Sequence, residues 1–484
     1  MAPTGTTSST SLPAEAQALE KYFVLDKARL NEIVTGFRRE FEDGLKNFGR
    51  DTAMIPSYCL SVPNGTEVGT FLALDLGGTN LRVCEVKLTG NHDFTVKQQK
   101  YKVSEALKHG DAKDLFDYIA ESVDAFMTEV GTENGEDEAV HLGFTFSFPV
   151  EQTALDKGTL LTWTKGFACK NAIGHDVVKL LQDALDAKHI KVKCSALVND
   201  TVGTLLSRSY QNGPALIGAI FGTGTNGAYI DKVETIEKLG KEAIAESQKG
   251  GPDAGEFMVI NTEWGAIDNG DNSPPFSALR FPTLPDLGEI VRNMLLYLID
   301  FSVLFDGHSS SILNTHYGLD TALVSEIEAA KSDDEVIKVL TKDLGMAKEV
   351  IKPEDVQIVK WACRIVSSRA ASLSACALAA VVLHTGRAQS NGTNDTIDIG
   401  MDGSYFLSLL VSVAEFLPFF EERMRAALRL ILGDEGEKRI KMGLAKDGSG
   451  VGAALCALQA KKAETANAGK PVHPQSKRMD ALVP

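Results

Sequence analysis

The sequence lacks the charge pattern of a general nucleic-acid binder. Its 49 lysines and arginines are outnumbered by 65 aspartates and glutamates, which gives a formal net charge of −16 and a pI of about 5.1. A protein that neutralises many nucleic-acid phosphates needs a basic surface, so we expect no nucleic-acid partner. A phosphate-bearing small molecule remains compatible with this charge, because a few backbone amides and local cations can hold it.

The sequence also lacks the spacings of metal sites and disulfide frameworks. It has seven cysteines without a Cys-x-x-Cys pair and nine histidines without metal-ligand spacing. This pattern is typical of free thiols in a reducing compartment, and we expect no metal site built from cysteines and histidines. The longest apolar runs, at 370–383 and 405–413, contain serines and fall short of the roughly 18 residues of a membrane span. Because the polar start also resembles no signal peptide, a cytoplasmic chain without a membrane span is expected.

Length and hydrophobic patterning favour two lobes of mixed α/β structure. The 484 residues exceed one ordinary domain, and 44% of them are hydrophobic, which allows large cores. Helices are expected at 14–45, 111–131, 177–187, 287–300, 320–384 and 413–432. Strands are expected at 70–103, 141–149 and 195–198. We interpret residues 1–14 as a disordered leader, 132–138 and 243–255 as loops, and 465–484 as a loose tail.

One strand–turn–strand pattern occurs twice. Residues 71–84 form an apolar strand, a glycine turn that ends in Thr79-Asn80, and a second strand. Residues 217–230 repeat this plan and end their turn with Thr225-Asn226, 146 residues further along the chain. This spacing is too long for a solenoid repeat. A duplicated domain explains it, and a chance echo of two hairpins is the alternative.

The two glycine turns are candidate phosphate-binding sites. Glycine lets the backbone approach an anion closely and direct its N–H groups at it. In the first turn, Asp75 stands where a carboxylate can hold Mg²⁺, and Arg82 is long enough to reach a phosphoryl group. A plain tight hairpin is the alternative. The missing Gly-Lys-Ser/Thr ending excludes a Walker A loop.

Asp200 is a candidate general base. It follows a predicted buried strand at 195–198, and a carboxylate in such a place can accept a proton from a hydroxyl group. Asp and Thr are also favoured at helix N-caps, so a capping role for Asp200 is the alternative.

Two further clusters suit a sugar ligand. Residues 162–167 place Thr164 and Lys165 beside aromatic side chains, and residues 261–265 place Glu263 beside Trp264. Sugar sites combine such polar groups with an apolar wall. Plain core packing is the alternative role for each tryptophan.

Together these motifs resemble the eukaryotic hexokinase family. The resemblance is carried by residues 75–83, 142–153, 161–167, 197–206, 220–230 and 261–266, which stand in the family's order. It extends over residues 17–462, nearly the whole chain. A chain of this length is similar to the single-unit fungal type, not to the doubled animal type.

The resemblance implies the actin-like ATPase (ribonuclease H-like) fold, an α/β fold with two lobes around a cleft. The N-terminal region, with the small lobe, would span 15–210 and the large lobe 211–464. It implies an ATP:hexose 6-phosphotransferase that uses ATP and Mg²⁺ to phosphorylate glucose and related hexoses at the 6-hydroxyl, the first step of glycolysis. A homodimer is compatible with this interpretation of the sequence.

The resemblance also implies roles for single residues. Asp200 matches the catalytic base. Sugar-binding positions are matched by Ser147, Thr164, Lys165, Asn199, Asp200, Asn226 and Glu263. Nucleotide-binding positions are matched by Asp75, Gly77, Gly78, Thr79, Asn80, Arg82, Thr223, Gly224, Thr225, Asp402, Gly403 and Ser404. The turn at 447–450 resembles a second turn near the adenosine.

Two segments depart from the family pattern. Before Leu287 the chain lacks the stretch in which the family carries a second sugar-binding Glu, and residues 405–412 look like an insertion. Two hypotheses follow: an active hexokinase, or a hexokinase-like regulator that senses a sugar or a nucleotide with little turnover. The intact Asp200 favours the first, and the missing Glu favours the second.

Overall fold

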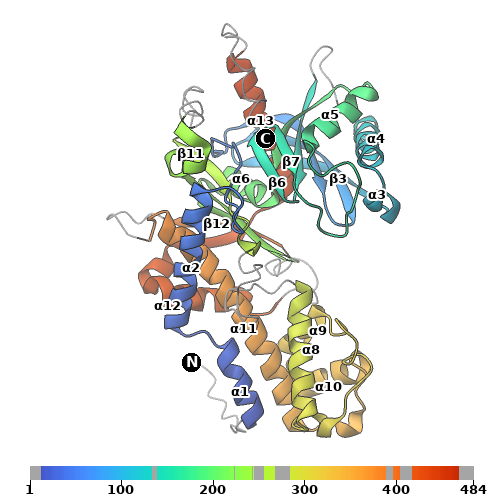
Figure 1. Ribbon diagram of the computed structural model, residues 1–484, viewed down its shortest axis with the longest axis vertical. Helices are drawn as coiled ribbons and strands as arrows, with labels where there is room; N and C mark the ends of the chain where they lie inside the picture. Colours follow the sequence, from blue (N-terminus) through green and yellow to red (C-terminus); the bar gives the residue numbers. More distant parts are fainter. Residues whose placement is uncertain are drawn as a thin grey trace. The chain divides into compact units, whose positions relative to one another are not determined.

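The computed structural model describes residues 12–132, 139–222, 224–241, 244, 256–266, 284–388, 396–403 and 417–467 (Figure 1). The chain forms two compact units, each assembled from three stretches. Unit 1 comprises Met1–Ile55, Pro214–Asp231 and Ile260–Gly448, and unit 2 comprises Pro56–Gly213, Lys232–Val259 and Ser449–Pro484. The expected division at residue 210 differs from these units, because residues before 56 pack in unit 1 and residues after 448 pack in unit 2.

Unit 2 is built on a five-stranded mixed sheet in the order β4-β3-β2-β5-β8. Its strands are β2 Val68–Leu76, β3 Asn80–Gly90, β4 Asp93–Lys102, β5 Val140–Phe146 and β8 Val192–Val198. β2 and β3 form an antiparallel hairpin across the first glycine turn, and β5 and β8 continue the sheet in parallel. β5 and β8 are buried along nearly their whole length, as parallel strands covered on both faces are.

Helices cover both faces of this sheet. α4 Ala112–Val130 and α5 Val177–Ala187 pack together over the face into which Leu142 and Phe144 of β5 point. Gly143 points to the opposite face, because successive strand residues alternate. There α13 Gly448–Asn467 lies so close that a Cβ on Gly143 would stand 2.1 Å from the Ala453 carbonyl oxygen. Only glycine therefore allows α13 to rest on β5.

Unit 1 carries a six-stranded sheet in the order β1-β11-β10-β9-β12-β13. Its strands are β1 Ile55–Pro56, β9 Ile217–Phe221, β10 Thr225–Lys232, β11 Phe257–Asn261, β12 Ile397–Asp402 and β13 Ile440–Leu444. β9 and β10 form an antiparallel hairpin, and β12 and β13 continue in parallel. In both sheets the first five strands from the hairpin onward lie in the order third, second, first, fourth, fifth. This shared order supports the duplicated-domain interpretation.

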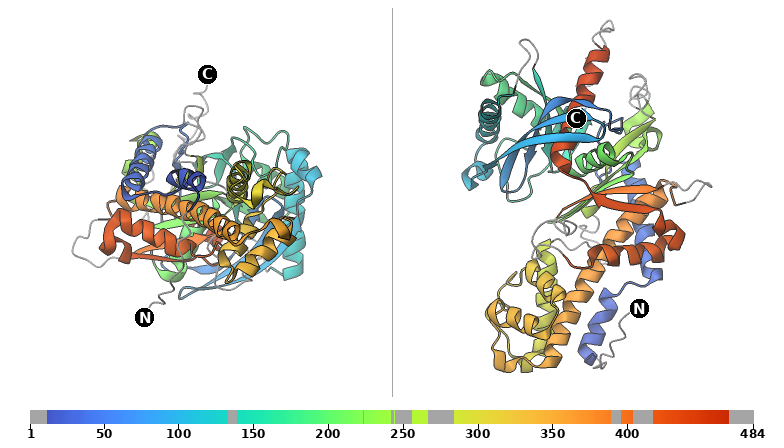
Figure 2. Two further views of the ribbon diagram at one scale, coloured as in Figure 1. Left: turned by 90° about the horizontal axis from the view of Figure 1, so that it is seen from below. Right: turned by 180° about the vertical axis from the view of Figure 1, so that it is seen from behind.

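Three helices of unit 1 lie side by side in both figures: α2 Lys27–Lys46, α11 Pro353–His384 and α12 Phe420–Lys438 (Figures 1 and 2). The remaining α-helices are α1 Ala14–Phe23, α8 Leu284–Asp300, α9 Thr321–Ala329 and α10 Asp333–Lys342 in unit 1, and α3 Glu105–His109 and α6 Asp200–Asn212 in unit 2. The expected helix at 14–45 is interrupted at 24–26, before the Asp26 side chain caps α2. The expected helix at 320–384 is three helices, because Gly345 turns with a positive φ and Pro353 starts α11.

α11 is the one helix in the described stretches that is long and apolar enough to cross a membrane by length and composition. In its most apolar window, 83% of the residues are buried inside the protein. Core helices show the same pattern, so this is weak evidence for a span.

Several expectations lie on residues outside the described ones: most of the leader at 1–14, the loops at 132–138 and 243–255, both departures from the family pattern, and most of the tail. The tail begins later than expected, since α13 continues to Asn467.

Candidate functional site

In unit 2, the first glycine turn is bounded by an ion pair. Asp75 at the end of β2 is the cross-strand partner of Arg82 on β3, and Arg82 Nη2 lies 2.9 Å from Asp75 Oδ2. Ser449, in the first turn of α13, donates its hydroxyl to the same carboxylate oxygen at 2.8 Å and accepts from Arg82. From the sequence, Ser449 is assigned only to the turn at 447–450 and not to the surroundings of Asp75. Its contact with Asp75 joins residues 374 positions apart, for which no local pattern is a signal.

The turn itself offers its backbone to a ligand. The Gly77 N–H donates to the Asn80 carbonyl oxygen and closes the hairpin, while Thr79 and Asn80 are exposed. A Cβ on Gly78 would meet the Lys165 side chain at 3.6 Å, so this predicted sugar residue lies beside the turn. An exposed glycine turn beside a lysine suits an anion such as a phosphate group.

The helix cap at α6 belongs to Asn199. Its side-chain Oδ1 accepts from the Thr201 backbone N–H at 2.9 Å, and Asp200 is the first helical residue. Asp200 also accepts from this N–H through Oδ1, at 2.9 Å, while its side chain remains half-buried. The capping alternative for Asp200 is therefore wrong, because the residue before it makes the cap.

The environment of Asp200 favours its protonated form. Burial raises the pKa of the Asp200 carboxyl above its ordinary value, and the nearby Asp75 carboxylate adds to this rise. The Lys165 ammonium, a hydrogen bond from Ser147 and the Thr201 N–H oppose it. Perturbed carboxyl groups of this kind cluster at functional sites.

The loop at 161–167 brings the Lys165 ammonium into the field of this carboxylate. Lys165 has a left-handed backbone with φ of 56°, which non-glycine residues rarely adopt, and its ammonium lies 5.3 Å from the centre of the Phe148 ring. Thr164 is exposed in the same loop. Trp163 stacks on Phe167 and donates its indole N–H to the Cys169 carbonyl oxygen at 2.9 Å. The core-packing alternative thus fits Trp163.

In unit 1, a network of amides holds Glu263. Asn226 Nδ2 donates to Glu263 Oε1 at 3.0 Å and to Asn261 Oδ1 at 2.9 Å, and Asn261 Nδ2 donates to Glu263 Oε1 at 2.7 Å. Glu263 also has a left-handed backbone, with φ of 56°. Asn261 was not among the predicted site residues, although it precedes Glu263 by two positions. The structure gathers the two predicted sugar residues of unit 1 into one network.

The nucleotide-binding candidates of unit 1 lie at the ends of β9, β10 and β12. Gly224 is exposed and a Cβ there would meet nothing within 4 Å, so this turn also presents its backbone. Gly403 has φ of 103°, and a Cβ there would lie 2.4 Å from the Phe221 carbonyl oxygen. Its N–H donates to Asp402 Oδ1. Thr223 and Ser404 lie outside the described residues.

The predicted residues thus divide between the units. Unit 2 holds the first glycine turn with Ser147, Thr164, Lys165, Asn199 and Asp200; unit 1 holds the second turn with Asn226, Glu263, Asp402 and Gly403.

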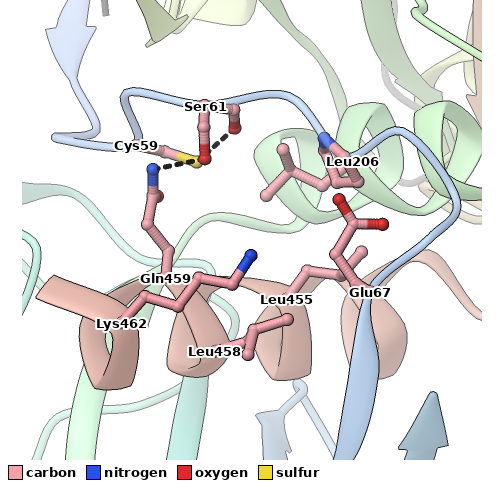
Figure 3. A pocket seen from close by; sticks show the side chains of 9 residues that line it. Cys59, Ser61, Glu67, Leu206, Leu455, Leu458, Gln459 and Lys462 are labelled. Carbon is pink, nitrogen blue, oxygen red and sulfur yellow. Dashed lines mark hydrogen bonds between the residues drawn. The ribbon is translucent and has the colours of Figure 1, made fainter. Parts of the chain in front are cut away.

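Two cavities of unit 2 lie away from these residues. One, between the segment 59–67 and helices α6 and α13, holds about 30 Å³, room for a water molecule but not for a sugar (Figure 3). In it Gln459 of α13 contacts the Ser61 hydroxyl. The other is an open groove of about 920 Å³ beside α5 and β8. No predicted site residue is among the residues that line either one.

The described stretches contain no group of three or more His, Cys, Asp or Glu side chains suited to a metal ion. Nucleotide enzymes commonly hold Mg²⁺ without such a cluster, through the phosphates of the substrate and one or two carboxylates. The described residues fit Mg²⁺ only in this manner. Asp75, at the end of β2 beside the exposed turn, is the carboxylate that fits this role.

Models of the hexokinase family match most of the chain. One matches residues 15–210 and a second matches 216–279 and 287–459. The gap at 280–286 falls where the chain departs from the family pattern.

Curated relatives cover nearly all of the chain. A glucokinase of Aspergillus niger is 39% identical over 505 residues, covering 94% of this chain and 99% of the relative. Glucokinase-1 of Saccharomyces cerevisiae is 36% identical over 493 residues, covering 90% and 95%. Both alignments are longer than the 484 residues of this chain, so each contains positions without a counterpart here.

A solved structure, a hexokinase from Schistosoma mansoni complexed with glucose, matches with a TM-score of 0.75 at 34% identity. The match covers 92% of this chain and 98% of that one. This likeness confirms the expected actin-like ATPase fold. With the family models and the fungal relatives, it shows that the chain belongs to the hexokinase family.

Proposed function

We propose that the chain is a hexokinase that transfers the terminal phosphoryl group of ATP to the 6-hydroxyl of glucose and related hexoses. The observation that carries the proposal is the half-buried Asp200 carboxylate, which accepts from Ser147 and lies in the field of Lys165. Family membership supports the substrate class. Seven buried free cysteines accord with a reducing, cytoplasmic setting for this reaction.

Asp200 would act as the general base. Its raised pKa makes the ionised carboxylate a stronger proton acceptor than that of an ordinary aspartate. Ser147 and Lys165 stabilise the carboxylate form and hold it in place. The Thr201 N–H fixes the orientation of Oδ1.

The two glycine turns and Arg82 would bind and orient the phosphates. Backbone amides and a guanidinium offset the negative charge that spreads over the transferring group, so positioning and electrostatics supply most of the rate. Mg²⁺, when bound with ATP, neutralises charge on the phosphate oxygens, and Asp75 is the residue that would hold it. Asn226 and Asn261 would keep Glu263 oriented toward sugar hydroxyls.

A direct assay tests the proposal. Purified protein is incubated with glucose and Mg-ATP, and glucose 6-phosphate is identified by phosphorus NMR. Formation of this product at turnover rates typical of kinases, about 1–100 s⁻¹, is expected. ATP hydrolysis without sugar phosphate, or no reaction with any hexose, would refute the proposed function.

The rate should depend on pH through Asp200. Activity falls as the base is protonated, and since its pKa is raised, the acid limb of kcat/KM should lie above the ordinary aspartate value of about 3.9. Ser147→Ala removes a hydrogen bond that favours the charged form, so the limb should move to higher pH. Thr164→Val, in the neighbouring loop, is the matched control and should leave the limb in place. An unmoved limb in Ser147→Ala would show that another group controls it.

Glucose binding should be weaker than in family members that carry the second sugar-binding Glu. Losing one charged acceptor to a hydroxyl costs about 1.5–3 kcal/mol, or roughly tenfold to a hundredfold in affinity. Calorimetry would compare the chain with a graft of the family segment between Asn272 and Leu287. The same graft with Gln in place of its Glu is the control. Equal affinity with and without the graft would contradict the prediction.

A further inference from the structure

Besides Asn226, which binds Glu263 directly, Trp264 is a residue of unit 1 that touches both predicted ligand-binding segments. Its side chain is fully buried, and its indole N–H donates to Thr225 Oγ1 at 3.0 Å. Thr225 belongs to the second glycine turn. Trp264 itself follows Glu263 directly in the chain, in the short helical turn Trp264–Ala266.

The backbone around Trp264 leaves no room for the two segments to shift past each other. A Cβ on Gly227 would lie 2.1 Å from the indole ring, and a Cβ on Gly265 would lie 2.4 Å from the Thr225 carbonyl oxygen. The Trp264 N–H donates to Thr262 Oγ1 at 3.2 Å, and that hydroxyl donates to the Gly227 carbonyl oxygen at 2.8 Å. Gly227 and Gly265 therefore allow the start of β10 and the segment after β11 to pack closely around the Trp264 indole.

Trp264 is also connected, through Phe221, to the third predicted segment at residues 402–404. Phe221 stacks on Trp264 with 6.4 Å between ring centres and an angle of 24° between the planes. Gly403 packs its backbone against Phe221. All three ligand-binding segments of unit 1 thus meet, directly or through Phe221, at Trp264.

The indole also fixes the direction of a hydroxyl group. Because Thr225 Oγ1 accepts the indole N–H, the hydrogen of that hydroxyl must point away from Trp264. A threonine hydroxyl held in this way can donate to an anion beside the glycine turn. Without the indole the same hydroxyl could turn and offer its lone pairs instead, which would repel a phosphate oxygen.

We propose that Trp264 is a positioning residue that couples sugar binding at Glu263 to nucleotide binding at the second glycine turn. The inference rests on the proposed function and adds a positioning residue to it. Because the two segments are packed together, a sugar that displaces Glu263 would carry Trp264 with it, and through the indole the Thr225 hydroxyl. The second ligand then meets a segment that is already in place, which is positive cooperativity within unit 1.

A role in core packing alone makes a different prediction. Trp264→Phe keeps an aromatic ring beside Phe221 but removes the N–H and part of the ring that packs against Gly227. If the ring matters solely for packing, this change lowers Tm and leaves ligand coupling intact. If the N–H positions Thr225, coupling is lost.

The experiment measures glucose affinity by calorimetry with and without a non-hydrolysable ATP analogue and Mg²⁺. In the unaltered protein the analogue should tighten glucose binding at least fivefold, and glucose should tighten the analogue by the same factor, because coupling is reciprocal. In Trp264→Phe this factor should fall close to one, and kcat should fall more than the KM for glucose rises.

Two further variants keep the test decisive. Thr225→Val removes the acceptor with little change of shape and should abolish the same coupling, and the double variant should lose no more than either single one. Trp361→Phe is the matched control: this tryptophan of α11 is also buried in unit 1, and its indole donates to Glu20 at 3.3 Å, outside the predicted site. It should keep both activity and coupling.

The outcomes separate the two claims. Coupling that persists in folded Trp264→Phe and Thr225→Val, or an unaltered protein without coupling, overturns the inference while the kinase assignment stands. An unaltered protein that phosphorylates no hexose overturns the proposed function itself.

Discussion

Asp200→Asn is expected to lower kcat by about 10²–10⁴-fold while glucose binding is largely retained. Asparagine keeps the size of the side chain and can still accept hydrogen bonds, but it cannot take the proton of the sugar hydroxyl. Steady-state kinetics gives kcat, and calorimetry gives glucose affinity for the same preparation. Turnover close to that of the unaltered protein would rule out Asp200 as the base.

Asp200→Asn should also have a higher free energy of unfolding than the unaltered protein at neutral pH. The same measurement checks that the variant is folded. The pKa of Asp200 is higher in the folded state than in the unfolded state. Between these two pKa values the folded protein therefore binds more protons than the unfolded protein does. As a result, the free energy of unfolding falls as pH rises through this window. Neutral pH lies above the unfolded-state pKa, so this loss of stability is present there, and Asn removes it. Below the unfolded pKa the difference in Tm should vanish. An Asn variant that is less stable at pH 7 would contradict the raised pKa.

Gly143→Ala should destabilise unit 2 by about 3 kcal/mol or more, at the upper end of the overpacking range. The added Cβ would stand 2.1 Å from the Ala453 carbonyl oxygen, and backbone lies on both sides of the contact, so β5 and α13 must separate. Because α13 also carries Ser449, the Asp75 contact should weaken with it. Thermal unfolding followed by circular dichroism measures the effect.

Gly78→Ala provides the matched control for stability. Its added Cβ would meet only the Lys165 side chain at an ordinary 3.6 Å and should leave Tm nearly unchanged. If Gly143→Ala unfolds at the same temperature as this control, α13 does not rest on β5 as described.

Local pattern in the sequence was sufficient for the elements around the site. Both hairpins, α4, α5 and the strand before Asp200 form where alternation and helical spacing place them. The two glycine turns follow from glycine's freedom at tight turns, and their repetition anticipated the strand order that the two sheets share. These features depend on residues that are only a few positions apart, and such short spacings can be read directly from the sequence.

Contacts between distant residues could not be obtained in this way. The sequence could not tell whether Asn199 or Asp200 caps α6, because both residue types suit a cap and only the backbone geometry separates them. Nor could it show that Ser449 shares the carboxylate of Asp75, or that Trp264 donates to Thr225 while Trp163 packs in a core. The units themselves interleave stretches from both ends of the chain.

The sequence by itself therefore determined the family, the duplicated plan and the chemistry available at each turn, because these reside in residue types and short spacings. Only the tertiary structure decided which side chains meet: the raised pKa of Asp200, the amide network around Glu263 and the indole that links it to Thr225. The physical reason is that burial and hydrogen bonding depend on distances in space. Those distances are set when segments as far apart as residues 75 and 449 fold against each other.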